Sequence, residues 1–266
     1  MSYPRFMGRP RKRHVQLALT RLERKRDKNG QWRGGAREGA GRPSFEKLGR
    51  RRASERHLAR PELSAHHPVH VVLRACKEIG SLRTHAVFGA IREATIQVYK
   101  HEETFRIVHF SIQKSHIHLL VEATDKAALS TGMKAFGISA AKHINALVSA
   151  ARGLPERRRG SVFTDRYHAT VLTNPKQVRH CISYVLNNWH HHGADRDRLK
   201  RPWKIDPYAS GLSFDGWKER EHRPYFETPS GYFGPLVAWP RTYFLSTGWR
   251  RHGLISIYEV PGGAGE

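Results

Sequence analysis

Two histidines separated by one residue are the first candidates for chemistry in this sequence. His116 and His118 flank Ile117 in an apolar run that ends at Val121. Alternate residues of a β-strand share a face, so the two imidazoles would lie side by side and could bind one divalent metal ion. The chain has 18 histidines, so roughly one such pair is expected by chance. Two strand histidines on a solvated face are the alternative interpretation.

A tyrosine in the last predicted helix is the second candidate. From Pro175 to about His191 the apolar residues recur with helical periodicity. This stripe consists of Val178, Cys181, Ile182, Val185, Leu186 and Trp189. Tyr184 lies outside the stripe, and Asn188 follows it by about one helical turn. The pair could therefore face a ligand, with Asn188 offering a carbonyl oxygen as a third metal ligand. A partly buried structural tyrosine is the alternative for Tyr184.

These residue types suit an attack on a phosphodiester. A phenol with a pKa near 10 is a poor nucleophile at neutral pH, but a metal ion that polarises the phosphate makes attack feasible. Attack by Tyr184 would give a phosphotyrosine and a free 3′ hydroxyl. Because the bond energy is kept for rejoining, this chemistry suits strand transfer better than hydrolysis.

The elements that must position these residues are expected between residues 66 and 195. Strands are predicted at Pro68–Leu73, Phe105–Ile112, His116–Val121 and Tyr167–Leu172, and helices at Leu82–Tyr99, Lys126–Ala151 and Pro175–His191. Ser81 and Asn174 are the expected caps of the first and last helices. The order is typical of an α+β, ferredoxin-like (split βαβ) antiparallel sheet with helices on one face and an appended catalytic helix. The other face would be open to a ligand.

The charge balance indicates a polyanionic partner. Lys and Arg number 47 against 23 Asp and Glu, a formal net charge of +24 with a pI near 10.7. Nucleic acid is the first candidate. An anionic membrane would call for a basic amphipathic helix or a lipidation signal, and neither is found. We therefore expect a cytoplasmic, nucleoid-associated protein. Its two cysteines are too few for a structural zinc site.

Residues 1–60 form a basic, glycine-rich arm that we expect to follow DNA phosphates. It holds 19 Lys and Arg but only 5 Asp and Glu. A second basic stretch lies in the loop 152–160. The expected DNA contacts are Arg11, Lys12, Arg13, Arg37, Arg42, Arg50, Arg51, Arg52, Arg157, Arg158 and Arg159.

The end of the chain carries two further patterns. Residues 196–266 form an extension in which aromatic residues are interleaved with basic ones. Such aromatics could stack on unpaired bases or fill the interior of an irregular segment. The run His190–His192 favours a solvated helix end over a zinc site, because no partner ligands occur at helical spacing.

The order of His116, His118, Tyr184 and Asn188 resembles the single-tyrosine HUH transposases, and in particular the REP-associated tyrosine transposases of bacteria. The resemblance covers about residues 66–195. It implies a ferredoxin-like fold and cleavage and joining of single-stranded DNA near hairpins through a 5′-phosphotyrosine. It also implies Mg or Mn as cofactor, His116, His118 and Asn188 as ligands, and Tyr184 as nucleophile. Trp189 stands where the family commonly has proline, so the last helix is expected to continue.

Two other functions remain open at this point. A non-catalytic, domesticated protein of the same fold could bind DNA or RNA, and its sequence would lack one of the catalytic elements. An initiator of replication or conjugation would use the same chemistry but usually carries further domains. The presence of His116, His118 and Tyr184 favours the enzyme, as a monomer or a homodimer.

Overall fold

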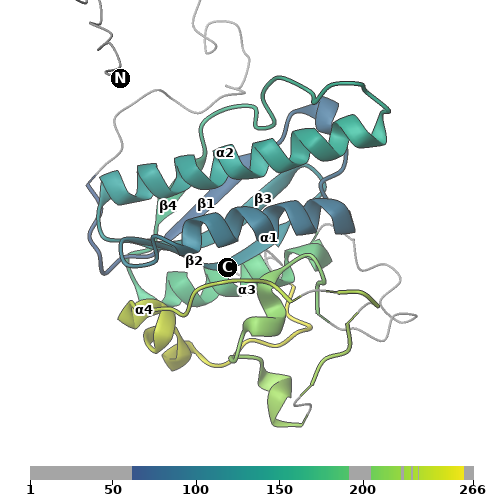
Figure 1. Cartoon of the computed structure of the whole chain (residues 1–266). Helices are drawn as coiled ribbons and strands as arrows, with labels where there is room; N and C mark the ends of the chain where they lie inside the picture. Colours follow the sequence, from purple (N-terminus) through teal and green to yellow (C-terminus); the bar gives the residue numbers. More distant parts are fainter. Residues whose placement is uncertain (1–61, 192–204, 223–224, 229, 233, 261–266) are drawn as a thin grey trace, which may run out of the picture. The chain divides into compact units, whose positions relative to one another are not determined.

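The strands and helices between residues 69 and 191 follow the predicted order. They are β1 (Val69–Arg74), α1 (His85–Tyr99), β2 (Phe105–Ile112), β3 (His116–Ala123), α2 (Lys126–Ala151), β4 (His168–Val171) and α3 (Pro175–His191). A short 3-10 turn, η1 (Lys77–Ile79), precedes α1. The computed structural model describes residues 62–191, 205–222, 225–228, 230–232 and 234–260 (Figure 1).

The sheet has the ferredoxin-like arrangement. Its strand order is β2-β3-β1-β4, and β1 pairs antiparallel with both β3 and β4, as β2 does with β3. The two central strands therefore come from different βα units, which is the split βαβ topology. The predicted fold class is confirmed.

Two apolar layers lie on opposite faces of the sheet. α1 and α2 lie side by side on one face, and α3 lies on the other (Figure 1). Ile117, Leu119 and Val121 of β3 are fully buried in the layer under α1 and α2. Val108 and Leu120 belong to the second layer, beneath α3 and the end of the chain. The second face is thus less open than the sequence suggested, because apolar residues after position 204 cover part of it.

The helix caps agree with the sequence at α3 and differ at α1. At α3, the Gln177 amide donates to Asn174 Oδ1 at 2.9 Å, as predicted. At α1 the cap is Thr84 instead of Ser81, and its side chain accepts from the Val87 amide. Helix α1 begins later because the buried Leu82 donates its backbone amide to the Lys114 carbonyl, which holds the preceding residues out of a helix.

Replacing Asn174 by alanine is expected to destabilise the protein by about 1 kcal/mol, because the first turn of α3 loses the acceptor of its cap. Thermal unfolding should shift down by roughly 2–4 °C for a protein of this size. Lys176→Ala, at an exposed position of the same turn, is the control and should leave the midpoint unchanged. Equal midpoints for both variants would contradict a capping role.

The extension after residue 204 is packed onto the second face and along one edge of the sheet. It contains the short helices η2 (Ser210–Ser213), η3 (Lys218–Glu221), α4 (Tyr243–Ser246) and η4 (Gly248–His252). Trp217 and Trp249 are buried, whereas Tyr225 and Trp239 are exposed. The Ala238 amide donates to the Ile107 carbonyl at 2.9 Å, so the extension covers part of the edge of β2. Trp217 and Trp249 therefore fill the interior, which is one of the two alternatives that the sequence left open, whereas Tyr225 and Trp239 do not.

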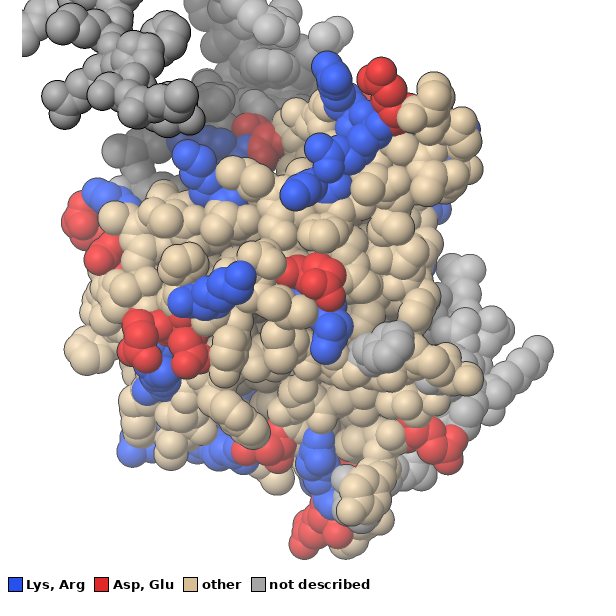
Figure 2. Space-filling model, viewed as in Figure 1, with Lys and Arg blue, Asp and Glu red and all other residues tan. Residues whose placement is uncertain are grey.

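Charge is unevenly spread over the described surface. On the side that α1 and α2 cover, basic side chains gather near α2 and elsewhere alternate with acidic ones (Figure 2). Among the helices that the structure describes, none combines the length and the apolar character that crossing a membrane requires.

Candidate active site

His116 and His118 lie next to each other on the α3 side of β3. Their ring centroids are 4.7 Å apart, and the ring planes are nearly perpendicular. His118 is buried at 3% exposure, and His116 is half-buried. Both rings point away from the layer that holds Ile117 and Leu119, because side chains alternate along the strand. The predicted placement of the two imidazoles on one face is confirmed.

Tyr184 of α3 lies against His118. The two ring centroids are 5.2 Å apart, with the ring planes at 87°. The predicted apolar stripe of α3 is buried along its whole length, whereas Tyr184 is half-buried. The fold therefore brings a phenol and an imidazole from separate elements to the same point.

Asn188 lies one turn beyond Tyr184 and is fully buried. Its carboxamide is close to the Tyr184 hydroxyl, yet neither Oδ1 nor Nδ2 makes a hydrogen bond of normal geometry. Burial raises the pKa of Tyr184, the Cys181 thiol adds to that rise, and the Asn188 side chain lowers it in part. A buried amide without a hydrogen bond is costly, so its position calls for a ligand or another partner.

A third histidine, His70 of β1, completes this cluster. Its Nε2 is 3.0 Å from His118 Nδ1, and its ring is 5.9 Å from that of Tyr184. If His118 donates from Nδ1, a lone pair remains on Nε2, which is the nitrogen that a metal ion would take. His70 was not among the residues predicted from the sequence. Its only local signal is its alternation with the buried residues Val69 and Val71.

The protonation of His70 predicts a pH dependence of stability. Burial, with a smaller contribution from His168, lowers the pKa of His70 to about 4. Between pH 6.5 and about 4, His70 is therefore protonated in the unfolded chain but neutral in the native state. We expect the unfolding free energy to be fully retained above pH 6.5 and to fall by up to about 3 kcal/mol towards pH 4. Thermal unfolding across this range measures it, and His70→Gln should flatten the profile. A variant profile as steep as that of the wild type would contradict the assignment.

The donors at this site fit a divalent ion in part. Within the described residues, no three His, Cys, Asp or Glu side chains are grouped closely enough to hold a metal ion. An ion at His116 and His118 would therefore need additional oxygen ligands. The buried carboxamide of Asn188 makes no hydrogen bond of normal geometry and can supply one of these ligands, and the oxygens of a bound phosphate can supply more.

A second buried carboxamide lies at the start of the hairpin that carries the histidines. The backbone amide of Gln113 donates to the His116 carbonyl at 2.8 Å, and the side-chain Nε2 of Gln113 donates to Ser111 Oγ at 3.3 Å. Ser111 pairs with His118 in the sheet register. Gln113 lies between the two strands predicted at Phe105–Ile112 and His116–Val121, and only the pairing of these strands reveals its position beside the histidines.

The end of the extension holds α3 in place through polar contacts. Arg179 donates to both carboxylate oxygens of Glu259 at 2.6 and 2.8 Å, and Ser183 Oγ donates to Glu259 Oε1 at 2.6 Å. Asn187 Nδ2 donates to the Ser256 carbonyl at 2.9 Å. Burial raises the pKa of Glu259, but the hydrogen bonds from Arg179 and Ser183 outweigh it and lower that pKa overall. These contacts fix the residues on both sides of Tyr184.

The remaining predicted residues have mixed positions. His190 is half-buried, with Nε2 2.8 Å from the Ile257 carbonyl, so it is not part of a solvated helix end.

Arg158 Nη1 donates to Asn145 Oδ1 at 2.7 Å and thus binds its own chain, whereas Arg157 and Arg159 are exposed. Helix α3 continues past Trp189 to His191, as expected. The eight predicted contacts of the arm, Arg11, Lys12, Arg13, Arg37, Arg42, Arg50, Arg51 and Arg52, lie outside the described residues.

The segment that contains this cluster matches a known family. Residues 64–188 match the family model described as "Transposase IS200 like". This range covers slightly less than half of the chain, which is similar there to the IS200-like transposase family. The matched range begins just before β1 and ends at Asn188, so it includes His70, His118 and Tyr184.

Similar solved structures include two related to transposases. One is a REP-associated tyrosine transposase bound to a REP hairpin, with 18% identity, coverage of 52% of this chain and 75% of that chain, and a TM-score of 0.38. The other is a candidate transposase from Deinococcus radiodurans, with 13% identity, coverage of 56% and 96%, and a TM-score of 0.33. No curated protein matches the chain.

Proposed function

We propose that this protein is a DNA transposase that cleaves and rejoins single-stranded DNA near hairpins, with Tyr184 as the nucleophile. The contact between Tyr184 and His118, whose ring centroids are 5.2 Å apart, carries the proposal. It supports the proposal because the Tyr184 phenol would act beside a candidate metal ligand, in a segment that matches the IS200-like transposase family model. The order of His116, His118, Tyr184 and Asn188 further favours the REP-associated tyrosine transposases within that family.

In this reaction Tyr184 Oη attacks the phosphorus, and the 3′ oxygen of the preceding nucleotide leaves. The products are a 5′-phosphotyrosine and a free 3′ hydroxyl, and the reverse attack rejoins a strand. His116, His118 and Asn188 would hold the Mg or Mn ion, which withdraws charge from the non-bridging oxygens. His70 orients the ring of His118, and the contacts of α3 with Glu259 fix the backbone that carries Tyr184.

The rest of the chain would bind and position the DNA. We assign residues 1–60 to a DNA-binding arm, 66–195 to the catalytic domain and 196–266 to an extension that supports α3. Arg157 and Arg159 are exposed and suited to phosphate contacts, as are the basic residues of the arm. In this proposal the protein acts as a monomer or a homodimer in the cytoplasm, associated with the nucleoid.

The test is the covalent intermediate. The full chain is incubated with a library of single-stranded hairpin DNAs and Mg or Mn, and the products are separated on a denaturing gel. We expect a protein–DNA adduct that requires the metal and that mass spectrometry maps to Tyr184. Tight binding without an adduct in either metal would favour a non-catalytic DNA- or RNA-binding protein of the same fold. An adduct at another residue would refute the assigned nucleophile.

A further inference from the structure

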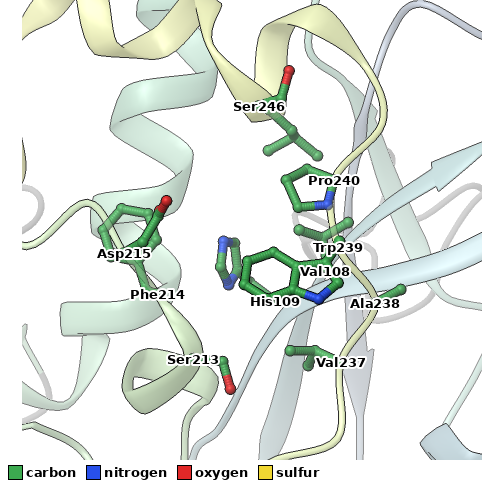
Figure 3. Close-up of a pocket in the computed structure, with 11 residues that line it drawn as sticks. Val108, His109, Ser213, Phe214, Asp215, Val237, Ala238, Trp239, Pro240 and Ser246 are labelled. Atoms are coloured by element: carbon green, nitrogen blue, oxygen red, sulfur yellow. The ribbon is translucent and has the colours of Figure 1, made fainter.

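A cavity separate from the histidine cluster lies between β2 and the extension. It has a volume of about 300 Å³ and is lined by 11 residues from β2, from 213–215 and from 237–246 (Figure 3). His109 and Phe214 form part of its wall, with ring centroids 5.4 Å apart and planes at 85°. Trp239 lines it as well. A cavity of this size is at the lower end of the range for small-molecule sites and can take one planar heterocycle.

The lining of this cavity combines aliphatic, aromatic and polar residues and contains no lysine or arginine. None of the 11 lining residues is Lys or Arg, although the chain has a formal charge of +24. Its one carboxylate, Asp215, is paired with Arg250 at 2.7 Å. His109 is buried, and this burial lowers its pKa to about 4, so its ring is neutral at physiological pH. Such a lining favours a neutral ligand with hydrogen-bonding edges over a phosphate.

Trp239 is an exposed indole on an anchored backbone. Its side chain is 75% exposed. On one side of it the Ala238 amide donates to the Ile107 carbonyl at 2.9 Å, and on the other the Thr242 amide donates to Glu122 at 2.8 Å. A large apolar ring held in this way gains nothing from burial but offers a flat face for stacking.

The cavity lies on the same face of the sheet as the histidine cluster. His109 pairs with Leu120, and Ser111, two residues on, pairs with His118. From the strand spacings, the Cα atoms of His109 and His118 are roughly 8 Å apart. A nucleotide near the one attacked by Tyr184 would thus be close to the cavity.

We propose that this cavity binds one unpaired nucleobase of the DNA strand that occupies the proposed active site, with the base stacked on Trp239. The inference rests on the proposed function and adds to it a base-binding site formed by β2 and the extension. The ring of His109 would meet the polar edge of the base, and Ser213 also lines the cavity, whereas the Ser246 hydroxyl donates to the Thr242 carbonyl at 2.9 Å. The extension therefore contributes to substrate recognition as well as to the support of α3.

The test separates base contacts from backbone contacts. The probes are an oligothymidylate of about 20 nucleotides, longer than one binding site, and an abasic strand of equal length. We expect the wild type to prefer the oligothymidylate by roughly 10-fold or more, as stacking of one base predicts. Trp239→Ala should lose this preference. Its affinity for the abasic strand, and the salt dependence of that affinity, should equal those of the wild type. Ser213→Phe, which adds a bulky ring at the wall of the cavity and leaves the indole in place, should also reduce the preference for the oligothymidylate.

The control is Tyr225→Ala, because Tyr225 is 87% exposed but does not line the cavity. It should bind both strands as the wild type does. If Trp239→Ala loses affinity for both strands equally, or keeps the preference of the wild type for the oligothymidylate, the base-binding site is overturned. Adduct formation is scored separately with the hairpin library. Base-dependent binding without an adduct would support the base-binding site and refute the proposed function. An adduct without base-dependent binding would support the proposed function and refute the base-binding site.

Discussion

Tyr184→Phe is expected to abolish the covalent protein–DNA adduct, with a loss of at least about 1,000-fold in cleavage rate, as is typical when a nucleophile is removed. The substitution deletes only the hydroxyl. The aromatic ring that contacts His70 and His118 is kept, so the fold and DNA affinity should be unchanged. The measurement is single-turnover cleavage of an end-labelled hairpin substrate in Mn or Mg, together with a binding titration.

The matched control for this loss is Tyr258→Phe. Tyr258 is 55% exposed and lies in the segment that holds α3, so the variant removes a phenol hydroxyl close to the same helix. It should cleave at the wild-type rate. An adduct that persists in Tyr184→Phe, or an equal loss in both variants, would show that the Tyr184 hydroxyl is not the attacking group.

The strands and helices up to residue 191 could be predicted because their signals are local. Alternation along β3 and the apolar stripe of α3 each fit within one element. Their bounds were predicted to within a few residues, and those of β2 and α2 agree with the structure. The start of α1 was misplaced because the amide of Leu82 bonds to Lys114, which belongs to another part of the chain.

The site was predicted only where its residues form a pattern in the sequence. His116 and His118 form a pair, and Tyr184 and Asn188 are spaced by one helical turn. His70 is a single histidine on a strand, and its role depends on the pairing of β1 with β3, in which Val72 lies opposite His118. That register follows from the folded sheet and cannot be read from β1 alone.

The support of α3 was also beyond local reasoning. Glu259 is separated from Arg179 by 80 residues, and the segment that carries it has no regular periodicity to reveal its partner. The role of Trp239 could not be predicted either, because the sequence does not distinguish it from the other aromatic residues of the extension. Only the folded structure shows the cavity beside it. Contacts between residues distant in sequence thus decide both how Tyr184 is held and where the proposed base would bind.

Glu122 is the second residue whose loss should have a large effect, here on stability. This β3 carboxylate is 2% exposed. It is 2.9 Å from Arg106 Nη1 and also accepts hydrogen bonds from the Thr242 amide and hydroxyl at 2.8 and 2.7 Å. It therefore ties β2, β3 and the extension together. Removing one partner of a buried ion pair leaves the other charge uncompensated, which costs much more than the pair itself contributes.

Glu122→Ala is expected to lower the free energy of unfolding by about 3–5 kcal/mol, because Arg106 would remain buried without its carboxylate. The thermal midpoint should fall by roughly 6–20 °C. Glu103→Ala is the matched control: this glutamate also pairs with an arginine, Arg241, at 3.0 Å, but its side chain is 80% exposed. Exposed pairs contribute little, so its midpoint should change by no more than about 2 °C. Similar shifts in the two variants would mean that Glu122 holds the extension no more firmly than a surface ion pair does.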